Sequence, residues 1–147
     1  LVYKRGVWYL VAQNPDVDEY RTFRVDQILE VSLSNVQFDY PESFSLDEHI
    51  GSSWGVYTND RVEIVRLKFS SRVASRVRSL RYHRSQELIE ELADGSVIIG
   101  LEVCGLIELK SWLLQWGNEV EVLEPISLRD EVVKSAKEIV ALYEYSE

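Results

Sequence analysis

The sequence predicts an α+β fold in which a short β-meander precedes a ferredoxin-like βαββαβ domain with an extra C-terminal helix. Three observations support this prediction. Aromatic and β-branched residues dominate two N-terminal segments that a turn separates. From residue 61 onward, segments of period two alternate with segments of helical period in the order strand, helix, strand, strand, helix, strand. Residues 127–144 then repeat apolar side chains at helical spacing.

The N-terminal meander is predicted to consist of strands at 2–13, 20–26 and 27–34. Asn14-Pro15-Asp16 separates the first two strands, because such residues favour turns. A three-stranded sheet with two open edges is marginal by itself. We therefore expect the meander to pack on the second domain or to be closed by a partner chain.

Residues 35–60 are predicted to connect the two domains. Ser45 and Glu48 form a capping box that begins a short helix ending near Ser53. Trp54 is expected to anchor the connector rather than to stack on a ligand. Three further aromatic residues are expected to hold the connector against a neighbouring surface: Phe38, Tyr40 and Phe44.

The second domain is predicted to contain four strands and three helices. The strands are expected at 61–70, 86–92, 96–103 and 119–123, and the helices at 71–80, 106–116 and 127–144. Asp94-Gly95 predicts a type I′ hairpin turn, because glycine accepts a positive φ. Gly117 is expected to end the second helix in a left-handed conformation.

The net charge of −9 argues against general binding of duplex DNA, which depends on neutralising phosphates. The charge is unevenly distributed, since residues 61–84 carry eight basic side chains and one acidic side chain. The flanking residues 1–60 and 85–147 are both acidic. A basic segment within an acidic chain predicts either a polyanion site or an internal electrostatic interface.

The composition favours a cytoplasmic protein. The single cysteine, Cys104, excludes an intramolecular disulfide and is expected to be a small buried hydrophobe. No stretch approaches the roughly 18–20 apolar residues of a membrane span. The N-terminus lacks the pattern of a signal peptide. The start at Leu1, directly before a strand, suggests a fragment of a longer chain.

Trp8 and Tyr9 precede Arg21 and Arg24 by about a dozen residues. Flat π surfaces stack on bases and guanidinium groups hold phosphate, so this combination predicts a binding site for an anionic ligand. Strict alternation places the two arginines on opposite faces of their strand unless a bulge intervenes. Two further cations at the rim of this set are Lys4 and Arg5.

An alternative interpretation of the same residues needs no ligand. Trp8 and Leu10 would then fill the core of the domain while Tyr9 faces outward. The arginines would pair with carboxylates on or near their own strand, and Glu19 and Asp26 are the closest in sequence.

The predicted helix 71–80 buries one face and exposes arginines on the other. The residues expected to bind a polyanion or to form an interface are Arg72, Arg76, Arg81 and Arg84. A ridge of arginines holds a polyanion backbone without reading its sequence. The alternative is an interface with the acidic remainder of the chain, of which Glu87, Glu90 and Glu91 are nearest in sequence. A cross-strand ion pair with Glu102 is expected for the strand that carries Arg66 and Lys68.

We expect neither enzymatic activity nor a cofactor. The two histidines, His49 and His83, lie in a predicted connector helix and a basic loop. The sequence contains no Cys/His metal spacing, no Gly-rich phosphate loop and no Gly-x-Ser-x-Gly motif. The carboxylates are scattered over predicted surface positions.

Two N-terminal motifs carry a family resemblance. Trp8-Tyr9-Leu10, followed by Tyr-Arg-Thr-Phe-Arg-Val-Asp-Gln-Ile at 20–28, resembles the C-terminal half of a WYL domain, the ligand-sensing module of many bacterial transcription regulators. Later segments resemble the WCX extension that follows WYL domains. They are Arg66–Ser70, His83–Gln86, Asp94–Val97, Glu108–Leu114 and Val122–Pro125.

This resemblance implies a partial WYL domain at 1–34, a linker at 35–60 and a WCX domain at 61–147. A complete WYL domain resembles an Sm-like or SH3-like barrel of about five strands, so the earlier strands are missing here. Family ligand sites use the motif tyrosine and nearby arginines, which implies an anionic ligand on Tyr9, Arg21 and Arg24.

By the same resemblance, the ligand is single-stranded DNA, a nucleotide or another anion, and the WCX module forms a homodimer. Promoter DNA would be bound only by an N-terminal helix-turn-helix absent from these residues, and no membrane is involved. The rival interpretation is a dimerisation or assembly module without a ligand. An enzyme with a pocket between the domains is a third and weaker alternative.

Overall fold

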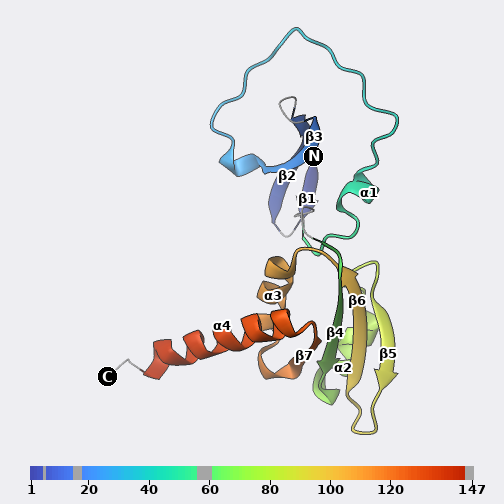
Figure 1. Cartoon of the computed structure of the whole chain (residues 1–147), viewed down its shortest axis with the longest axis vertical. Helices are drawn as coiled ribbons and strands as arrows, with labels where there is room; N and C mark the ends of the chain where they lie inside the picture. Colours follow the sequence, from blue (N-terminus) through green and yellow to red (C-terminus); the bar gives the residue numbers. More distant parts are fainter. Residues whose placement is uncertain (5, 15–17, 56–60, 145–147) are drawn as a thin grey trace.

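The computed structural model describes residues 1–4, 6–14, 18–55 and 61–144. These residues form an α+β structure with two antiparallel sheets and four α-helices (Figure 1). The three-stranded sheet lies at the N-terminal end, and the four-stranded sheet belongs to the second part of the chain.

The first sheet has the order β1-β2-β3, with β1 at Val2–Lys4, β2 at Val7–Asn14 and β3 at Glu19–Arg24. The prediction of one continuous strand at 2–13 is therefore wrong. Gly6 has a φ of +84°, a conformation that glycine adopts at little cost. The chain turns there and pairs β1 with β2 in antiparallel register.

The predicted strand at 27–34 is also wrong. A 3₁₀ helix, η1 at Val25–Gln27, follows β3 directly and turns the chain away from the sheet. The residues after η1 form no strand, and the side chain of Leu29 is fully exposed. Apolar alternation alone does not make a strand where no neighbouring strand accepts its hydrogen bonds.

The connector carries the short helix α1 at Leu46–Ile50. The Ser45 half of the predicted capping box is confirmed, because the Oγ atom of Ser45 accepts a hydrogen bond from the backbone N–H of Glu48 at 3.3 Å. The helix ends at Ile50 rather than near Ser53. The Phe44 ring lies 4.4 Å from the Tyr20 ring, centroid to centroid, so this aromatic residue holds the connector against the first sheet.

The second sheet and its helices follow the predicted order. The strands are β4 at Glu63–Phe69, β5 at Glu87–Glu91, β6 at Val97–Val103 and β7 at Val120–Glu124. The helices are α2 at Ser71–Ser79, α3 at Leu106–Leu114 and α4 at Ile126–Glu144. A second 3₁₀ helix, η2 at Gly117–Glu119, precedes β7. The spatial order β5-β6-β4-β7 places β5 and β7 at the edges, and each neighbouring pair is antiparallel.

One face of this sheet forms the hydrophobic core. Alternate residues of β4, including Leu67 and Phe69, are fully buried, whereas Ile64 and Arg66 are exposed. Val77 of α2 and Leu109 of α3 belong to the same buried cluster. Both helices therefore cover the same face, and burial of their apolar side chains is the main stabilising term.

The two predicted turns have different outcomes. Gly117 has a φ of +57°, which confirms the left-handed conformation expected after α3. The hairpin between β5 and β6 is present, but it is not type I′. A type I′ turn needs a positive φ at both Asp94 and Gly95. Gly95 has a positive φ, but Asp94 does not, since Asp18 is the only non-glycine residue with a positive φ among the described residues. The N–H of Gly95 donates to the Leu92 carbonyl at 2.9 Å, which indicates a type I turn followed by a left-handed glycine.

Trp54 joins the connector to the second domain, as expected. Its backbone N–H donates to the Cys104 carbonyl at 2.9 Å, and the Cys104 N–H donates to the Ser52 carbonyl at 2.8 Å. The indole is 2% exposed and lies 4.7 Å from the Trp112 ring, centroid to centroid. Cys104 is buried beside it, as predicted.

Replacement of Trp54 by alanine tests this anchor. We expect Trp54→Ala to lower the free energy of unfolding by about 3–5 kcal/mol, because it opens a cavity between the connector and α3. Urea denaturation followed by circular dichroism measures the loss. The control is Trp8→Ala, since Trp8 is 52% exposed and its removal is expected to cost about 1 kcal/mol or less. Equal losses in both variants would contradict the anchor.

Candidate functional site

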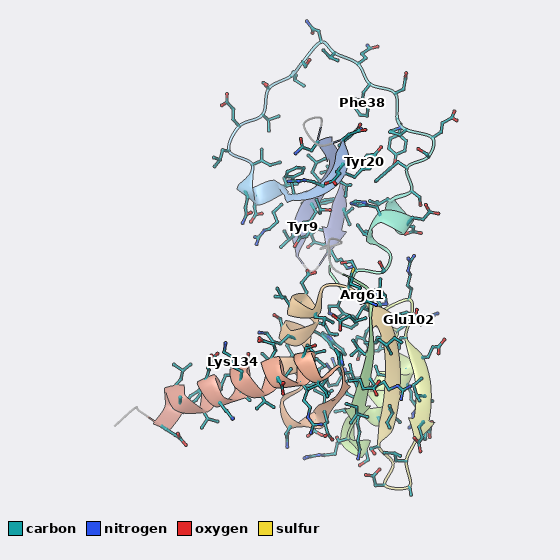
Figure 2. The ribbon with its side chains drawn as sticks, viewed as in Figure 1. Tyr9, Tyr20, Phe38, Arg61, Glu102 and Lys134 are labelled. Carbon is teal, nitrogen blue, oxygen red and sulfur yellow. The ribbon has the colours of Figure 1, made fainter. Side chains whose placement is uncertain are left out.

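The pairing of β2 with β3 sorts the predicted ligand residues onto two faces of the first sheet. Tyr9 lies directly opposite Arg24, so these two side chains share a face. Arg21 lies opposite Ala12, and β3 alternates regularly between exposed and half-buried residues. Arg21 and Arg24 therefore point to opposite faces, as alternation predicts. Figure 2 places Tyr9 on the part of this sheet nearest the second domain.

Arg24 is held in a fixed orientation. Its Nε and Nη2 atoms donate to the two carboxylate oxygens of Asp26 at 3.1 and 2.7 Å. This hydrogen bond is the main cause that lowers the pKa of Asp26 below its usual value. The Arg24 side chain is still 40% exposed. An orientated, partly exposed guanidinium can donate hydrogen bonds to an anion.

The opposite face carries Arg21 among exposed aromatic side chains. Arg21 lies 3.9 Å from the Glu19 carboxylate, at the limit of an ion pair, and both side chains are exposed. Trp8 and Phe23 are also exposed on this face, and the Trp8 ring lies 5.1 Å from the Tyr3 ring. The expected core position of Trp8 is not realised in the described chain.

A cavity of about 540 Å³ lies beside the same sheet but is separate from the predicted ligand residues. It is lined by the strand residues 10–13 and Tyr20 together with the connector residues 38–41 and Phe44. The lining includes neither Tyr9 nor the arginines of β3. The Tyr9–Arg24 pair therefore forms a surface rather than the wall of this cavity.

The Lys4 side chain is directed to the connector rather than to the rim of the predicted ligand site. Its Nζ atom donates to the backbone carbonyls of Ser53, at 3.5 Å, and of Gly55. The side chain therefore connects β1 to the segment that ends in the Trp54 anchor. Arg5, the other predicted rim cation, lies outside the described residues.

The basic segment makes contacts within the chain. Arg72 and Arg78 form ion pairs of 3.0 Å with Glu119 and Glu91, respectively. The Arg76 guanidinium lies 5.1 Å from the centre of the Trp116 ring, within the range of a cation–π contact. These contacts favour the interpretation of this segment as an internal interface.

The two arginines of the following loop also contact backbone. Arg81 donates to the Arg84 carbonyl at 2.6 Å, and Arg84 donates to the Asp47 carbonyl of α1 at 3.3 Å. The second contact joins the basic loop to the connector. Exposed ion pairs and hydrogen bonds of this kind exchange readily with water, so they do not prevent an anion from binding.

Arg66 does not form the expected cross-strand ion pair with Glu102. Arg66 lies opposite Gly100 on β6, and Glu102 lies opposite Ile64. The Nε atom of Arg66 instead approaches Glu124 of β7 at 3.5 Å. The two strands are neighbours, as predicted, but the register between them decides which side chains face each other.

Sequence reasoning missed a buried junction around His83. The imidazole stacks on Trp54 at 6.0 Å, and its Nδ1 atom accepts a hydrogen bond from the Ser85 N–H at 3.2 Å. Burial lowers the pKa of His83, and the nearby charge of Lys4 lowers it further. No local pattern connects residues so far apart in the sequence. The only signal was the isolated tryptophan in a polar connector.

The described residues offer no metal centre, since no three His, Cys, Asp or Glu side chains among them are grouped to hold an ion. None of the described helices is both long and apolar enough to cross a membrane.

Comparison with known families identifies both parts of the chain. The WCX domain matches residues 61–140, which is more than half of the sequence. The chain belongs to the WCX-domain family. The WYL domain matches residues 1–33, ahead of this WCX unit. The resemblance drawn from the two N-terminal motifs and the later segments is thereby confirmed.

Among solved structures, the WCX chain is similar to the proteasome accessory factor B/C (PafBC) of Arthrobacter aurescens. The two are 21% identical with a TM-score of 0.38, over 87% of this chain and 19% of PafBC. The chain thus spans about a fifth of the length of that protein. The comparison with curated proteins found no match.

The buried His83 predicts a pH-dependent stability. Because its pKa is lower in the folded chain than the ordinary 6.5, the unfolded chain binds the proton more readily. Stability therefore falls as the pH drops below about 6.5. We expect the melting temperature to decrease between about pH 7.5 and 5.5, and to decrease less in His83→Gln. The same pH dependence in both proteins would contradict this assignment.

Proposed function

We propose that this chain is the ligand-sensing and dimerisation region of a bacterial transcription regulator, and that its Tyr9–Arg24 surface binds an anionic effector derived from nucleic acid. One observation carries the proposal: Tyr9 of the WYL motif and the orientated Arg24 are direct cross-strand partners. The chain in which they occur matches the WYL and WCX domains. An aromatic ring beside a guanidinium provides stacking for a base and hydrogen bonds for a phosphate.

Arg24 supplies the phosphate contact in this proposal. Asp26 holds its guanidinium in place through hydrogen bonds from the Nε and Nη2 atoms. Arg24 therefore loses little conformational entropy when a ligand binds. Tyr9 presents its ring on the same face.

Arg21 can join the site if the ligand is a single strand of nucleic acid. β3 is an edge strand of its sheet, and Arg21 and Arg24 project from its two faces. Three residues along an extended strand span about 10 Å. An extended single strand that follows this edge can therefore contact both arginines, whereas a mononucleotide contacts one.

We further propose a partial Sm-like barrel for residues 1–34, a linker for 35–60 and a ferredoxin-like domain for 61–147. The element order and the strand order β5-β6-β4-β7 support the second assignment. In this proposal the chain is non-catalytic and needs no cofactor.

Signal transfer is proposed to run through the connector. Lys4 and the Trp54 anchor connect the WYL unit to the WCX unit. A ligand that binds two arrangements of these units with unequal affinity shifts the population between them. The WCX unit, as a homodimer, would relay that shift to an N-terminal helix-turn-helix that binds promoter DNA.

A second candidate function is an assembly module without a ligand. The observation that favours it is that both arginines of β3 already face carboxylates, Glu19 and Asp26. In that case the arginines only balance charge on the sheet, and no anion binds to them.

Oligonucleotide binding distinguishes the two functions. We expect a fluorescently labelled single-stranded DNA to bind the chain at low salt. Arg24→Ala removes a charged hydrogen bond and Tyr9→Ala removes the ring on which a base stacks, so each is expected to weaken binding about tenfold or more. Fluorescence anisotropy measures the affinity. Arg66→Ala is the matched control, because it removes an exposed, ion-paired arginine from the other sheet.

The salt dependence provides an independent readout. If phosphates are contacted, the logarithm of the affinity falls linearly with the logarithm of salt concentration, with a slope of about −0.7 per neutralised phosphate. We expect Arg24→Ala to reduce this slope. Binding that is absent in the parent chain, or that is unchanged in Arg24→Ala, supports the assembly module instead.

A further inference from the structure

The C-terminal half of α4 carries apolar side chains that the rest of the described chain does not cover. At the start of the helix Leu128 is buried, and Val132 packs against the core. Further along, Val140 is 51% exposed and Tyr143 is 80% exposed. Figure 1 shows this half of the helix projecting away from β7 and α3.

Four of the exposed apolar residues of α4 form one stripe. Val133, Ala136, Val140 and Tyr143 are spaced by three, four and three residues, so they line one side of the helix. A shallow groove of about 440 Å³ runs along the same side and is lined by Val133, Ala136, Lys137, Val140 and Glu144. Short helices without tertiary contacts are marginal in water, so this half of α4 gains stability from a partner that covers the stripe.

We propose that the partner is α4 of a second copy, packed antiparallel against this stripe. In an antiparallel pair of helices, the first residue of one stripe faces the last residue of the other. Val133 then faces the partner's Tyr143, and Ala136 faces the partner's Val140. Each layer combines a smaller with a larger side chain, as tight helix packing requires.

Charge supports the same register independently. Lys137 and Glu144 lie seven residues apart and therefore flank the stripe on the same side. In the antiparallel register, Lys137 of one copy comes beside the partner's Glu144, and the two-fold axis repeats this ion pair. A parallel pair would instead place Lys137 beside the partner's Val132, where it has no charge to meet. The apolar layers and the charges thus select one arrangement.

This inference names the surface for the self-association included in the proposed function. Self-association through α4 does not depend on the ligand, and it is tested by measuring molecular mass rather than oligonucleotide binding. Failure of the dimer proposal is therefore distinguishable from failure of the ligand proposal. Because the contact involves about three turns of helix from each copy, we expect a dimer that forms reversibly at micromolar concentrations.

Sedimentation velocity of the 147-residue chain over about 1–200 µM tests the surface. We expect a concentration-dependent dimer, and we expect Val140→Glu to raise the dissociation constant at least tenfold. The matched control is Leu142→Glu, which places the same charge on the same helix away from the stripe. Circular dichroism of each variant shows whether the fold is retained. A monomer at every concentration, or a dimer that Val140→Glu leaves intact, overturns the proposal.

A charge exchange tests the register. Lys137→Glu and Glu144→Lys alone each bring like charges together, so each is expected to weaken the dimer about threefold to tenfold. The double variant Lys137→Glu/Glu144→Lys restores the opposite pairing and is expected to return to within about twofold of the parent. If the double variant is as weak as the single ones, the antiparallel register is wrong.

Discussion

The burial of Trp54 is the interaction on which the arrangement of this protein depends. The indole lies between the connector and α3, and the backbone on either side of it exchanges hydrogen bonds with Cys104 at the end of β6. This contact joins the connector to the WCX core. Lys4 adds a second attachment, since its ammonium group binds the carbonyls next to the tryptophan. Lys4 thereby joins β1 to the segment that carries Trp54.

The Arg24–Asp26 contact has two physical consequences for the WYL unit. It removes most of the freedom of the guanidinium, which lowers the entropy lost when an anion binds. It also supplies a competing carboxylate, so an anion must interact more strongly with Arg24 than Asp26 does or share its donors.

The two units differ in how much apolar surface they leave exposed. The four-stranded sheet of the WCX unit buries the inward-facing residues of β4, β6 and β7 beneath its helices, while the edge strand β5 stays exposed. The three-stranded sheet of the WYL unit keeps Trp8 and Phe23 exposed on one face, and α4 keeps its apolar stripe exposed beyond the core. Both uncovered surfaces lie outside the main core, which is where binding of other molecules costs the fold least.

The sequence alone determined the order of elements from residue 61 onward, because strand and helix periods are local properties that each segment reports by itself. It also determined that Trp54 and Cys104 are buried and that Arg21 and Arg24 face opposite sides of a strand. The tertiary structure alone decided the register that pairs Arg66 with Glu124, the break of the first strand at Gly6 and the loss of the strand at 27–34. It also decided the junction of Lys4, Trp54 and His83. The register and the junction depend on contacts between residues far apart in the chain, and no local pattern encodes which distant partner a side chain meets. The two changed strand boundaries depend on where the backbone turns and finds a neighbouring strand.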